Sequence, residues 1–344
     1  MLTIKVRNVH QALPEAARLL LSNGVARGSR NGTVLALDEP LSTEYQKPTE
    51  RVLFWPDRDA NPFFHLFESL WMLAGRNDVA FLARFNQQMV SYSDDGARFV
   101  GAYGYRWRVH FQRDQLSSIA SALIADPSCR RQVLTMWDPH VDLGNRGKDL
   151  PCNTHAYFQR AANGSLSMMV SNRSNDALWG AYGANAVHFS VLQEYLAARI
   201  GCSVGAYHQV SANTHVYLER HGVLLERLAR LASDPPTPRR DPYSGGVVSP
   251  FPLIQTPIEV WERNLQLFVR QGSEFEFDDP FFAGIAAPML RAHERWSEKG
   301  SAARFDSARR ALEGCMPSDW RVACEQWVDR REAAALGGAR KVDA

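Results

Sequence analysis

"DLPCNTHAYFQ" (Asp149–Gln159) is the stretch on which the interpretation of fold and function depends. It places Cys152 directly after a proline, between a charged loop and a segment that is typical of a β-strand. Most cysteines inside proteins are small buried apolar residues. A nucleophilic cysteine instead needs a lowered pKa, which nearby guanidinium groups provide. The rest of the chain must decide between these two roles for Cys152.

The composition predicts an ordinary globular protein. Hydrophobic residues make up 45% of the 344 residues and charged residues 22%, which suits a packed core and argues against disorder. With 39 Lys and Arg against 37 Asp and Glu, the net charge of +2 favours neither nucleic acid nor membrane as a partner. The chain begins without an apolar signal core and has no long uninterrupted apolar run, so we expect neither secretion nor a membrane span.

The five cysteines are odd in number and widely spaced, and they form no CxxC or Cys/His metal pattern. We therefore expect a reduced, cytoplasmic protein that binds no metal. Four of them are expected to be core residues: Cys129, Cys202, Cys315 and Cys324.

Hydrophobic periodicity predicts strands interspersed with helices. Strands are expected at residues 2–6, 130–139, 154–161, 164–174 and 204–219, and helices at 9–24, 61–75 and 184–201. Residues 25–37 are expected to form a basic, glycine-containing turn that runs into a further strand. Residues 232–252, rich in Pro, Gly and Ser, are expected to form a long loop, with a mostly helical segment from Ile258 and a frayed tail at 335–344. With no repeat and no clear boundary, we predict one α+β domain over residues 1–344, built on a mixed β-sheet flanked by helices.

Four arginines near turns and strand ends suit a phosphate. Arg130 and Arg131 form a pair in "CRR", Arg173 lies in "NRSND", and Arg30 lies in the glycine turn "SRNGT". A guanidinium makes bidentate, charge-assisted hydrogen bonds to phosphate oxygens. Each arginine taken singly is a surface charge, but guanidinium groups close to Cys152 would also lower the pKa of its thiol.

Seven short motifs, in order along the chain, resemble the folate-dependent thymidylate synthase family. They are "SRNGT", "FESLWMLAG", "GAYGYRWR", "DPSCRR", "LPCNTHAYFQ", "NRSNDALWG" and "ANTHVYLE", and they run from about Arg30 to Tyr217. One motif alone would be weak evidence, whereas the ordered set is specific. The last third of the chain has no secure counterpart. The resemblance implies transfer of a one-carbon unit from 5,10-methylenetetrahydrofolate to C5 of a pyrimidine nucleotide monophosphate, on a thymidylate synthase-like fold.

The resemblance also implies the roles of the reacting groups. Cys152 would add to C6 of the pyrimidine and so make C5 nucleophilic. Glu68 would act as a general acid and base through water, with a pKa raised by its apolar neighbours in "FESLWML". Tyr103 would orient the water that removes the C5 proton. Asp176, like Glu68, would lie against the folate.

The nucleotide-binding residues are implied in the same way. Arg30, Arg173 and Ser174 would hold the phosphate. Arg130 and Arg131 would reach that phosphate from the second subunit of an obligate homodimer. The base would be read by Asn185, and the sugar 3′-hydroxyl by His215 and Tyr217, which lie on one side of a strand because they are two residues apart.

Four departures from the synthase motifs together favour a site that admits water. Asn153 follows the nucleophile where the family has histidine, and the folate-walling tryptophans are missing from "VSYSDDGAR" (Val90–Arg98). The base-reading "GLPFN" is "GAYGAN", and the chain ends in "RKVDA", unlike the short apolar end that excludes water in the synthases. A wetter site would let water add to the exocyclic methylene that is left after one-carbon transfer. We therefore predict a hydroxymethylase that forms 5-hydroxymethyl-dUMP or 5-hydroxymethyl-dCMP.

The identity of the base stays open. Counted without a gap, the family's asparagine falls on Ala184, and a one-residue bulge would bring Asn185 to the base. An amide matches the N3–H and O4 of uracil, whereas a carboxylate would suit cytosine better. Uracil is therefore favoured if Asn185 reaches the base. Ser174 and the paired arginines favour a deoxyribose.

Three other functions compete with this prediction. One is an ordinary thymidylate synthase with a divergent folate wall, and another is a nucleotide-binding homologue that has lost the chemistry. The third is a cysteine hydrolase that pairs Cys152 with a histidine. His155, three residues further along a strand, would face the opposite side, which is poor geometry for a dyad.

Overall fold

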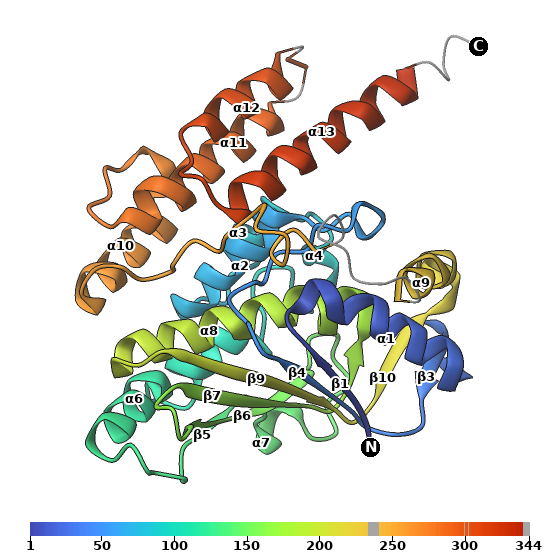
Figure 1. Ribbon diagram of the computed structural model, residues 1–344, viewed down its shortest axis with the longest axis vertical. Helices are drawn as coiled ribbons and strands as arrows, with labels where there is room; N and C mark the ends of the chain where they lie inside the picture. Colours follow the sequence, from blue (N-terminus) through green and yellow to red (C-terminus); the bar gives the residue numbers. More distant parts are fainter. Residues whose placement is uncertain (233–240, 299, 302, 340–344) are drawn as a thin grey trace.

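The computed structural model describes residues 1–232, 241–298, 300–301 and 303–339 (Figure 1). The predicted fold class is confirmed, because the described strands form mixed sheets over which helices lie. The strands are β1 (Leu2–Val6), β2 (Gly24–Ser29), β3 (Gly32–Leu37), β4 (Leu41–Tyr45), β5 (Val133–Thr135), β6 (Asn153–Arg160), β7 (Leu166–Asn172), β8 (Asn175–Asp176), β9 (Val204–Ser211) and β10 (Thr214–Tyr217).

The helices cover the sheets and make up the C-terminal part (Figure 1). The α-helices are α1 (Val9–Asn23), α2 (Pro62–Leu73), α3 (Val79–Ala83), α4 (Met89–Tyr92), α5 (Tyr103–Tyr105), α6 (Gln115–Ala125), α7 (Pro139–Asp142), α8 (Asn185–Ile200), α9 (Leu218–Ala232), α10 (Ile258–Gln271), α11 (Ala287–Ser297), α12 (Arg304–Glu313) and α13 (Asp319–Ala339). Short 3₁₀ and π-helical turns are η1 (Pro56–Arg58), η2 (Arg106–His110), η3 (Ala177–Ala184), η4 (Gly272–Glu274) and η5 (Phe282–Ala286).

The larger sheet has six strands in the order β1-β4-β9-β7-β6-β5. The pairs β1/β4 and β7/β9 are parallel, and the other pairs are antiparallel. Along β6 and β7, Phe158 and Met168 are buried, whereas Tyr157 and Met169 remain 38% and 37% exposed. One face of this sheet therefore packs in the core, and the other lies open along β6 and β7.

A second sheet of four strands, in the order β2-β3-β10-β8, replaces the single sheet that the pattern predicts. The predicted strand at residues 204–219 is broken at Ala212 and Asn213, after which β10 pairs with β3 and β8 instead of continuing beside β4. The parallel pairing of β8 with β10 sets Asp176 opposite His215. The break in the strand thus brings two predicted site residues together.

Helix α2 lies at the centre of the fold. Its sequence "PFFHLFESLWML" is apolar nearly all round, as expected of a helix buried on several sides. Asn61 caps it by accepting a hydrogen bond from the Phe64 N–H at 3.1 Å, and Pro62 occupies its first turn, where a missing N–H has little effect. An added Cβ at Gly104 would lie 1.9 Å from the carbonyl oxygen of Met72. Glycine is therefore required where α5 approaches α2.

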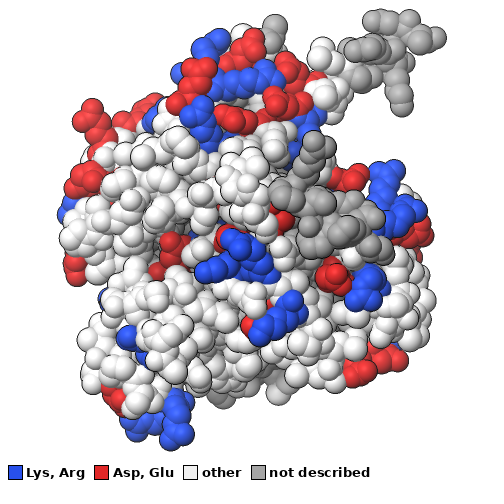
Figure 2. All heavy atoms as spheres, in the orientation of Figure 1, with Lys and Arg blue, Asp and Glu red and all other residues white. Residues whose placement is uncertain are grey.

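The C-terminal helices pack on α2. The ring of Phe63 lies 5.3 Å from that of Trp327 in α13, and the ring of Phe67 lies 5.7 Å from that of Phe268 in α10. On the face drawn in Figure 2, Lys and Arg are interspersed with Asp and Glu over these helices, and Arg309 joins α12 to α13 through Asp329 at 2.8 Å. The helical segment predicted from Ile258 onward is confirmed.

Two predictions concern the loop and the tail. Residues 241–252 of the predicted loop contain turns without helix or strand, and residues 233–240 lie outside the described residues. Helix α13 continues to Ala339, so residues 335–339 are helical where the composition predicts fraying, and 340–344 lie outside the described residues. Within the described ranges, no helix combines the length and the apolar character that crossing a membrane requires.

Candidate active site

A cavity of about 230 Å³ gathers residues from five parts of the chain around the predicted nucleophile. Its walls are Phe64, Glu68, Met89, Tyr92, Tyr103, Cys152, Asn175, Asp176, Trp179, Gly180, Ala184, Asn185 and His188. Five of the predicted site residues are among them: Glu68, Tyr103, Cys152, Asp176 and Asn185. A thiol, two carboxyl groups, a phenol and an amide thus meet in one concave site, which is the usual form of a small-molecule site.

Cys152 lies half-buried in the loop directly before β6. Burial raises the pKa of Cys152 above its usual value, Arg173 lowers it, and Asp149 and Asp176 raise it further. The sequence-based expectation of a lowered pKa is therefore wrong for the chain as described, because one nearby guanidinium does not offset burial. A thiol in these surroundings needs a proton acceptor before it can attack.

Tyr103 holds the backbone of the nucleophile. Its hydroxyl oxygen accepts hydrogen bonds from the N–H groups of Cys152 at 3.1 Å and Asn153 at 3.3 Å. Burial raises the pKa of Tyr103, so its hydroxyl stays neutral. The Tyr103 hydroxyl hydrogen is free to point to a water in the cavity, as its predicted role requires.

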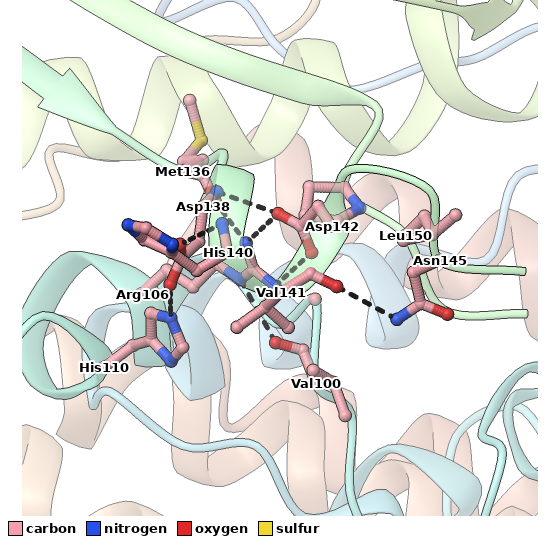
Figure 3. A network of polar contacts seen from close by, with 12 residues as sticks. Val100, Arg106, His110, Met136, Asp138, His140, Val141, Asp142, Asn145 and Leu150 are labelled. Carbon is pink, nitrogen blue, oxygen red and sulfur yellow. Dashed lines mark hydrogen bonds and ion pairs between the residues drawn. The ribbon is translucent and has the colours of Figure 1, made fainter. Parts of the chain in front are cut away.

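A buried ion pair supports the loops around this site (Figure 3). Arg106 is fully buried and pairs with Asp142, with Nη2 2.8 Å from Oδ1. The same guanidinium donates to the carbonyl oxygens of Met136 at 2.7 Å and Val100 at 3.1 Å. Val100 belongs to the segment before Tyr103, and Met136 and Asp142 belong to the segment that leads to Cys152. Arg106 therefore connects these two segments through its hydrogen bonds.

Glu68 reaches the cavity from the middle of α2, one turn after Phe64 on the same face. Burial raises the pKa of Glu68 to about 8, which confirms the direction predicted from its apolar neighbours. His188 of α8 places Nε2 3.2 Å from Glu68 Oε2, and burial lowers the pKa of His188 to about 3. Near neutral pH both groups are uncharged, so Glu68 is a carboxylic acid with a proton to donate.

Asp176 and Asn185 stand at the two ends of the π-helical turn η3. Asp176 caps the turn by accepting hydrogen bonds from the N–H groups of Leu178 at 2.9 Å and Trp179 at 3.1 Å. The backbone leaves helical geometry near its end, with φ −139° and ψ −109° at Gly183. A π-helical turn accommodates one more residue per turn than an α-helix does. Asn185 and Ala184 both line the cavity, so Asn185 reaches the site, as the expected one-residue insertion requires.

A chain of amides fixes Asn185. Asn153 Nδ2 donates to Asn185 Oδ1 at 3.3 Å, and Asn185 Nδ2 donates to Asn175 Oδ1 at 3.0 Å. An added Cβ at Gly180 would lie 2.8 Å from Asn175 Oδ1, so glycine leaves the room that these amides fill. Asn153 Oδ1 is buried and has no hydrogen-bond partner among the described residues. This orphan acceptor suits a bound water or ligand.

Arg30 and Arg173 converge on the segment before the nucleophile. Arg173 donates to the carbonyl oxygens of Pro151 at 2.9 Å and Leu150 at 3.2 Å, and Ser174 beside it is half-buried. Arg30, exposed in the turn between β2 and β3, places Nη1 3.5 Å from the carbonyl oxygen of Gly147. The two guanidinium groups thus border the same loop, as a phosphate site would require.

His215 and Tyr217 lie together on β10, as their spacing predicts. Their rings are 5.3 Å apart and nearly perpendicular. Burial lowers the pKa of His215, although Asp176 opposes this, and Asn213 Oδ1 lies 2.9 Å from His215 Nδ1. A neutral imidazole beside a phenol offers both a donor and an acceptor to a sugar hydroxyl.

Arg130 and Arg131 are not brought to this cavity. They lie between α6 and β5, and Arg130 borders a hollow of about 500 Å³ on the open face of the larger sheet. Gln132, Tyr157, Phe158, Gln159, Ser167, Met168, Met169 and His208 line the rest of that hollow. His155, also on β6, does not line the Cys152 cavity, so the geometry gives no support to a Cys152–His155 dyad.

The cavity also contains residues that the motifs do not single out. Tyr92 comes from the segment that lacks tryptophan, and Trp179 follows Asp176 by three residues. These two side chains remain 38% and 39% exposed beside the cavity. In the sequence, the aromatic residues within "VSYSDDGAR" and "NDALWG" could have indicated that Tyr92 and Trp179 line the site. His188 gives no such signal, because its partner Glu68 is far away in sequence.

A smaller cavity of about 130 Å³ adjoins the first and shares four walls with it: Glu68, Met89, Tyr92 and Tyr103. Its remaining walls are Trp71, Met72, Leu82, Phe99, Gly101, Ala102, Asp149, Leu150 and Pro151. Glu68 and Tyr103 thus stand between two spaces.

The other ligand-type residues form no metal site among the described residues, where no three or more His, Cys, Asp or Glu side chains could hold an ion together. All five cysteines are free. Cys129, Cys315 and Cys324 are buried, as expected of core residues, and Cys202 is half-buried.

Comparison with known proteins agrees with this geometry. The family model described as Thymidylate synthase matches residues 17–241. A protein of Pseudomonas phage M6, named deoxyuridylate hydroxymethyltransferase, is 53% identical over 336 residues, covering 97% of this chain and 95% of its own. A protein of Bacillus phage SP01 with the same name is 33% identical over 278 residues, covering 77% of this chain and 70% of its own.

A more partial likeness connects the chain to a cellular protein. A putative thymidylate synthase of Methanothermobacter marburgensis is 32% identical over 136 residues, covering 40% of this chain and 58% of its own. The matched family region contains every predicted site residue, from Arg30 to Tyr217. The ordered motifs, the shared cavity and these matches lead to one conclusion: the chain is an enzyme that belongs to the thymidylate synthase family.

Proposed function

We propose that the chain is a deoxyuridylate hydroxymethyltransferase, which transfers a one-carbon unit from 5,10-methylenetetrahydrofolate to C5 of dUMP and completes it with water. The observation that carries the proposal is the single cavity bordered by Cys152, Glu68, Tyr103, Asp176 and Asn185. The names of the phage M6 and SP01 relatives support both the substrate and the product.

The side chains divide the chemistry between them. The sulfur of Cys152 adds to C6 of uracil, and the electrons of the C5=C6 double bond move toward C5 and O4. Glu68, protonated near neutral pH, donates a proton toward the ring through water. Tyr103 keeps the Cys152 backbone in place and presents its hydroxyl to the water that takes the C5 proton.

The folate is proposed to bind beside this site. Trp179 and Tyr92 offer partly open aromatic faces on which a flat heterocycle can stack, and Phe64 and Met89 add apolar contact. Asp176, next to Trp179, offers a carboxylate to a ring N–H. When bound, methylenetetrahydrofolate supplies the one-carbon unit that becomes the exocyclic methylene.

The polar walls support water as the final reactant. Where the synthases have tryptophan, this chain has Tyr92, a more polar aromatic residue that lines both cavities. Water that adds to the exocyclic methylene gives a hydroxymethyl group, whereas hydride transfer gives methyl. A site that keeps water beside the methylene favours the first outcome.

Uracil and deoxyribose are the proposed base and sugar. Asn185 lines the cavity, and an amide can match both the N3–H and the O4 of uracil. His215 and Tyr217 are proposed to bind the 3′-hydroxyl, and Arg30, Arg173 and Ser174 the phosphate.

We also propose a homodimer in which the open sheet face is the interface. Arg130 lies on that face and away from its own chain's cavity, which supports delivery of Arg130 and Arg131 to the partner's phosphate site. The proposed compartment is the cytoplasm, since five free cysteines suit reducing conditions.

To test the proposal, the purified protein is incubated with methylenetetrahydrofolate and one nucleotide at a time: dUMP, dCMP, UMP or CMP. The mass of each nucleotide is then measured. We expect a gain of CH₂O on dUMP alone. A gain of CH₂ on dUMP would mean a thymidylate synthase, and a gain on dCMP would overturn the assignment of the base. Four unchanged nucleotides would support an inactive homologue.

A further inference from the structure

Cys152 does not line the smaller cavity beside its site. At about 130 Å³ it has room for a few water molecules, since one water occupies roughly 30 Å³ in the liquid. Its walls are largely apolar, but Glu68, Tyr103 and Asp149 supply polar groups. A recess of this size with several polar partners is suited to ordered water. We call this cavity the side chamber.

Asp149 is held rigidly at the wall of the side chamber. Its Oδ2 accepts a hydrogen bond from the Gly101 N–H at 2.7 Å. An added Cβ at Gly101 would lie 2.9 Å from Asp149 Oδ1, so the close contact depends on glycine. Asp149 also lies three residues before Cys152 in the same loop. The carboxyl group is therefore fixed between the backbone that precedes Tyr103 and the loop of the nucleophile.

The two carboxyl groups of the side chamber differ in charge near neutral pH. Burial raises the pKa of Asp149 to about 6, with Asp94 adding to the rise and with backbone N–H groups and Arg106 opposing it. Burial raises the pKa of Glu68 to about 8. Neighbouring groups whose pKa values are pushed apart divide into an acid and a base. Here Asp149 is the ionised group and Glu68 the protonated one.

We propose that Asp149 is the general base that activates a water in the side chamber for addition to the exocyclic methylene, an inference that rests on the proposed function. The water oxygen forms a bond to the methylene carbon while Asp149 takes one of its protons. The electrons of the exocyclic double bond move into the ring, giving an enolate with its charge on O4. The enolate then restores the C5=C6 double bond and expels the sulfur of Cys152 as a thiolate.

The step is balanced without an oxidant or a reductant. One water is added across the adduct, its hydroxyl going to carbon and its proton to Asp149, which then releases the proton to solvent. Glu68 takes no part in this step and keeps its proposed role as the acid in the steps before it.

Asp149→Asn tests this role, because an amide oxygen can still accept the Gly101 N–H while the amide cannot act as a base. The variant and the wild type are incubated with dUMP labelled with tritium at C5, methylenetetrahydrofolate and 2-mercaptoethanol. Release of tritium reports the steps up to loss of the C5 proton. Mass spectrometry separates 5-hydroxymethyl-dUMP from the thioether that forms when the thiol captures the methylene.

We expect D149N to release tritium at a rate close to that of the wild type, while 5-hydroxymethyl-dUMP formation falls by about 10²–10⁴-fold, the usual contribution of a general base. The thioether should become its main product. Asp94→Asn is the matched control: Asp94 acts on the same carboxyl group and accepts the Lys148 N–H at 3.0 Å, but it does not line the side chamber. It should keep the product ratio of the wild type.

Two results would overturn the role of Asp149. One is formation of 5-hydroxymethyl-dUMP by D149N at the wild-type rate. The other is a parallel loss of tritium release and hydroxymethyl formation, which would indicate a structural role. A wild-type protein that forms no 5-hydroxymethyl-dUMP would instead overturn the proposed function, and the inference with it, so the two failures are distinguishable.

Discussion

The hydroxyl oxygen of Tyr103 lies 3.1 Å from the backbone nitrogen of Cys152 and accepts its hydrogen bond. A side chain at the start of α5 thus determines how the loop of the proposed nucleophile is held, because the same oxygen also accepts the N–H of Asn153.

Tyr103→Phe should therefore affect stability and activity together. Loss of the shared acceptor leaves two N–H groups unpaired, which costs about 1–3 kcal/mol for a buried group. Urea unfolding measures the loss, and steady-state kinetics should show a lower kcat. Tyr105→Phe is the control, since Tyr105 is also half-buried in α5 but lies outside both cavities. Equal effects in both variants would contradict the role of Tyr103.

Cys152→Ala should abolish covalent attachment of the nucleotide and product formation. With 5-fluoro-dUMP and methylenetetrahydrofolate, C5 has no proton to lose, so the wild-type protein should gain the mass of both compounds. Cys202→Ala is the control, because Cys202 is equally half-buried and free. An adduct that persists in the Cys152 variant would exclude it as the nucleophile.

Glu68 makes folding stability depend on pH. Burial raises the pKa of Glu68 in the folded protein to about 8 from its ordinary value of 4.5. Between these two pH values the native protein keeps a proton that the unfolded chain has released. Stability should fall as the pH rises from about 4.5 to 8 and level off beyond. Glu68→Gln should flatten this fall by several kcal/mol, an order-of-magnitude figure at about 1.4 kcal/mol for each pKa unit. Glu15→Gln, at an exposed ion pair, should leave the slope unchanged.

Trp179 is expected to stack against the folate. Trp179→Ala should raise the KM for methylenetetrahydrofolate by about tenfold, since stacking of aromatic groups contributes roughly 1 kcal/mol beyond area burial. The Kd for dUMP should change little. Trp179→Phe retains an aromatic face and should recover most of the loss. A rise in the dUMP Kd of the alanine variant, with an unchanged folate KM, would exclude this role.

Asn185 and Ala184 both line the cavity, and substitution can separate them. Asn185→Ala should lower kcat/KM for dUMP by about 10–100-fold, the range for losing hydrogen bonds to a buried polar group. Ala184→Gly should stay near the wild-type value. The reverse ranking would mean that Ala184 occupies the base-reading position, as the ungapped alignment has it.

The sequence motifs predict those properties of the site residues that depend on residues close by in the sequence. Glu68 stands inside an apolar helix, and those flanks predict the burial that raises its pKa. The spacing of His215 and Tyr217 on one strand likewise predicts that their rings meet. The local sequence pattern is sufficient to predict these two features.

Other features depend on contacts between distant segments and cannot be read locally. The pKa of Cys152 follows from the balance between burial and Arg173, and only the folded loop sets that balance. The division into two sheets follows from a break of two residues between β9 and β10. Asp149 looks like a loop residue in the sequence, and its hydrogen bond from Gly101 holds it at a cavity that Glu68 also lines.

Helix α2 also has a second face. While Phe64 and Glu68 border the cavity, Phe63 and Phe67 contact Trp327 and other aromatic rings of the C-terminal helices, which lie beyond the matched family region. Local unfolding of those helices would bare two phenylalanines on the helix that carries the proposed acid. Opening of the C-terminal helices and loss of order at the acid are therefore expected as one cooperative event.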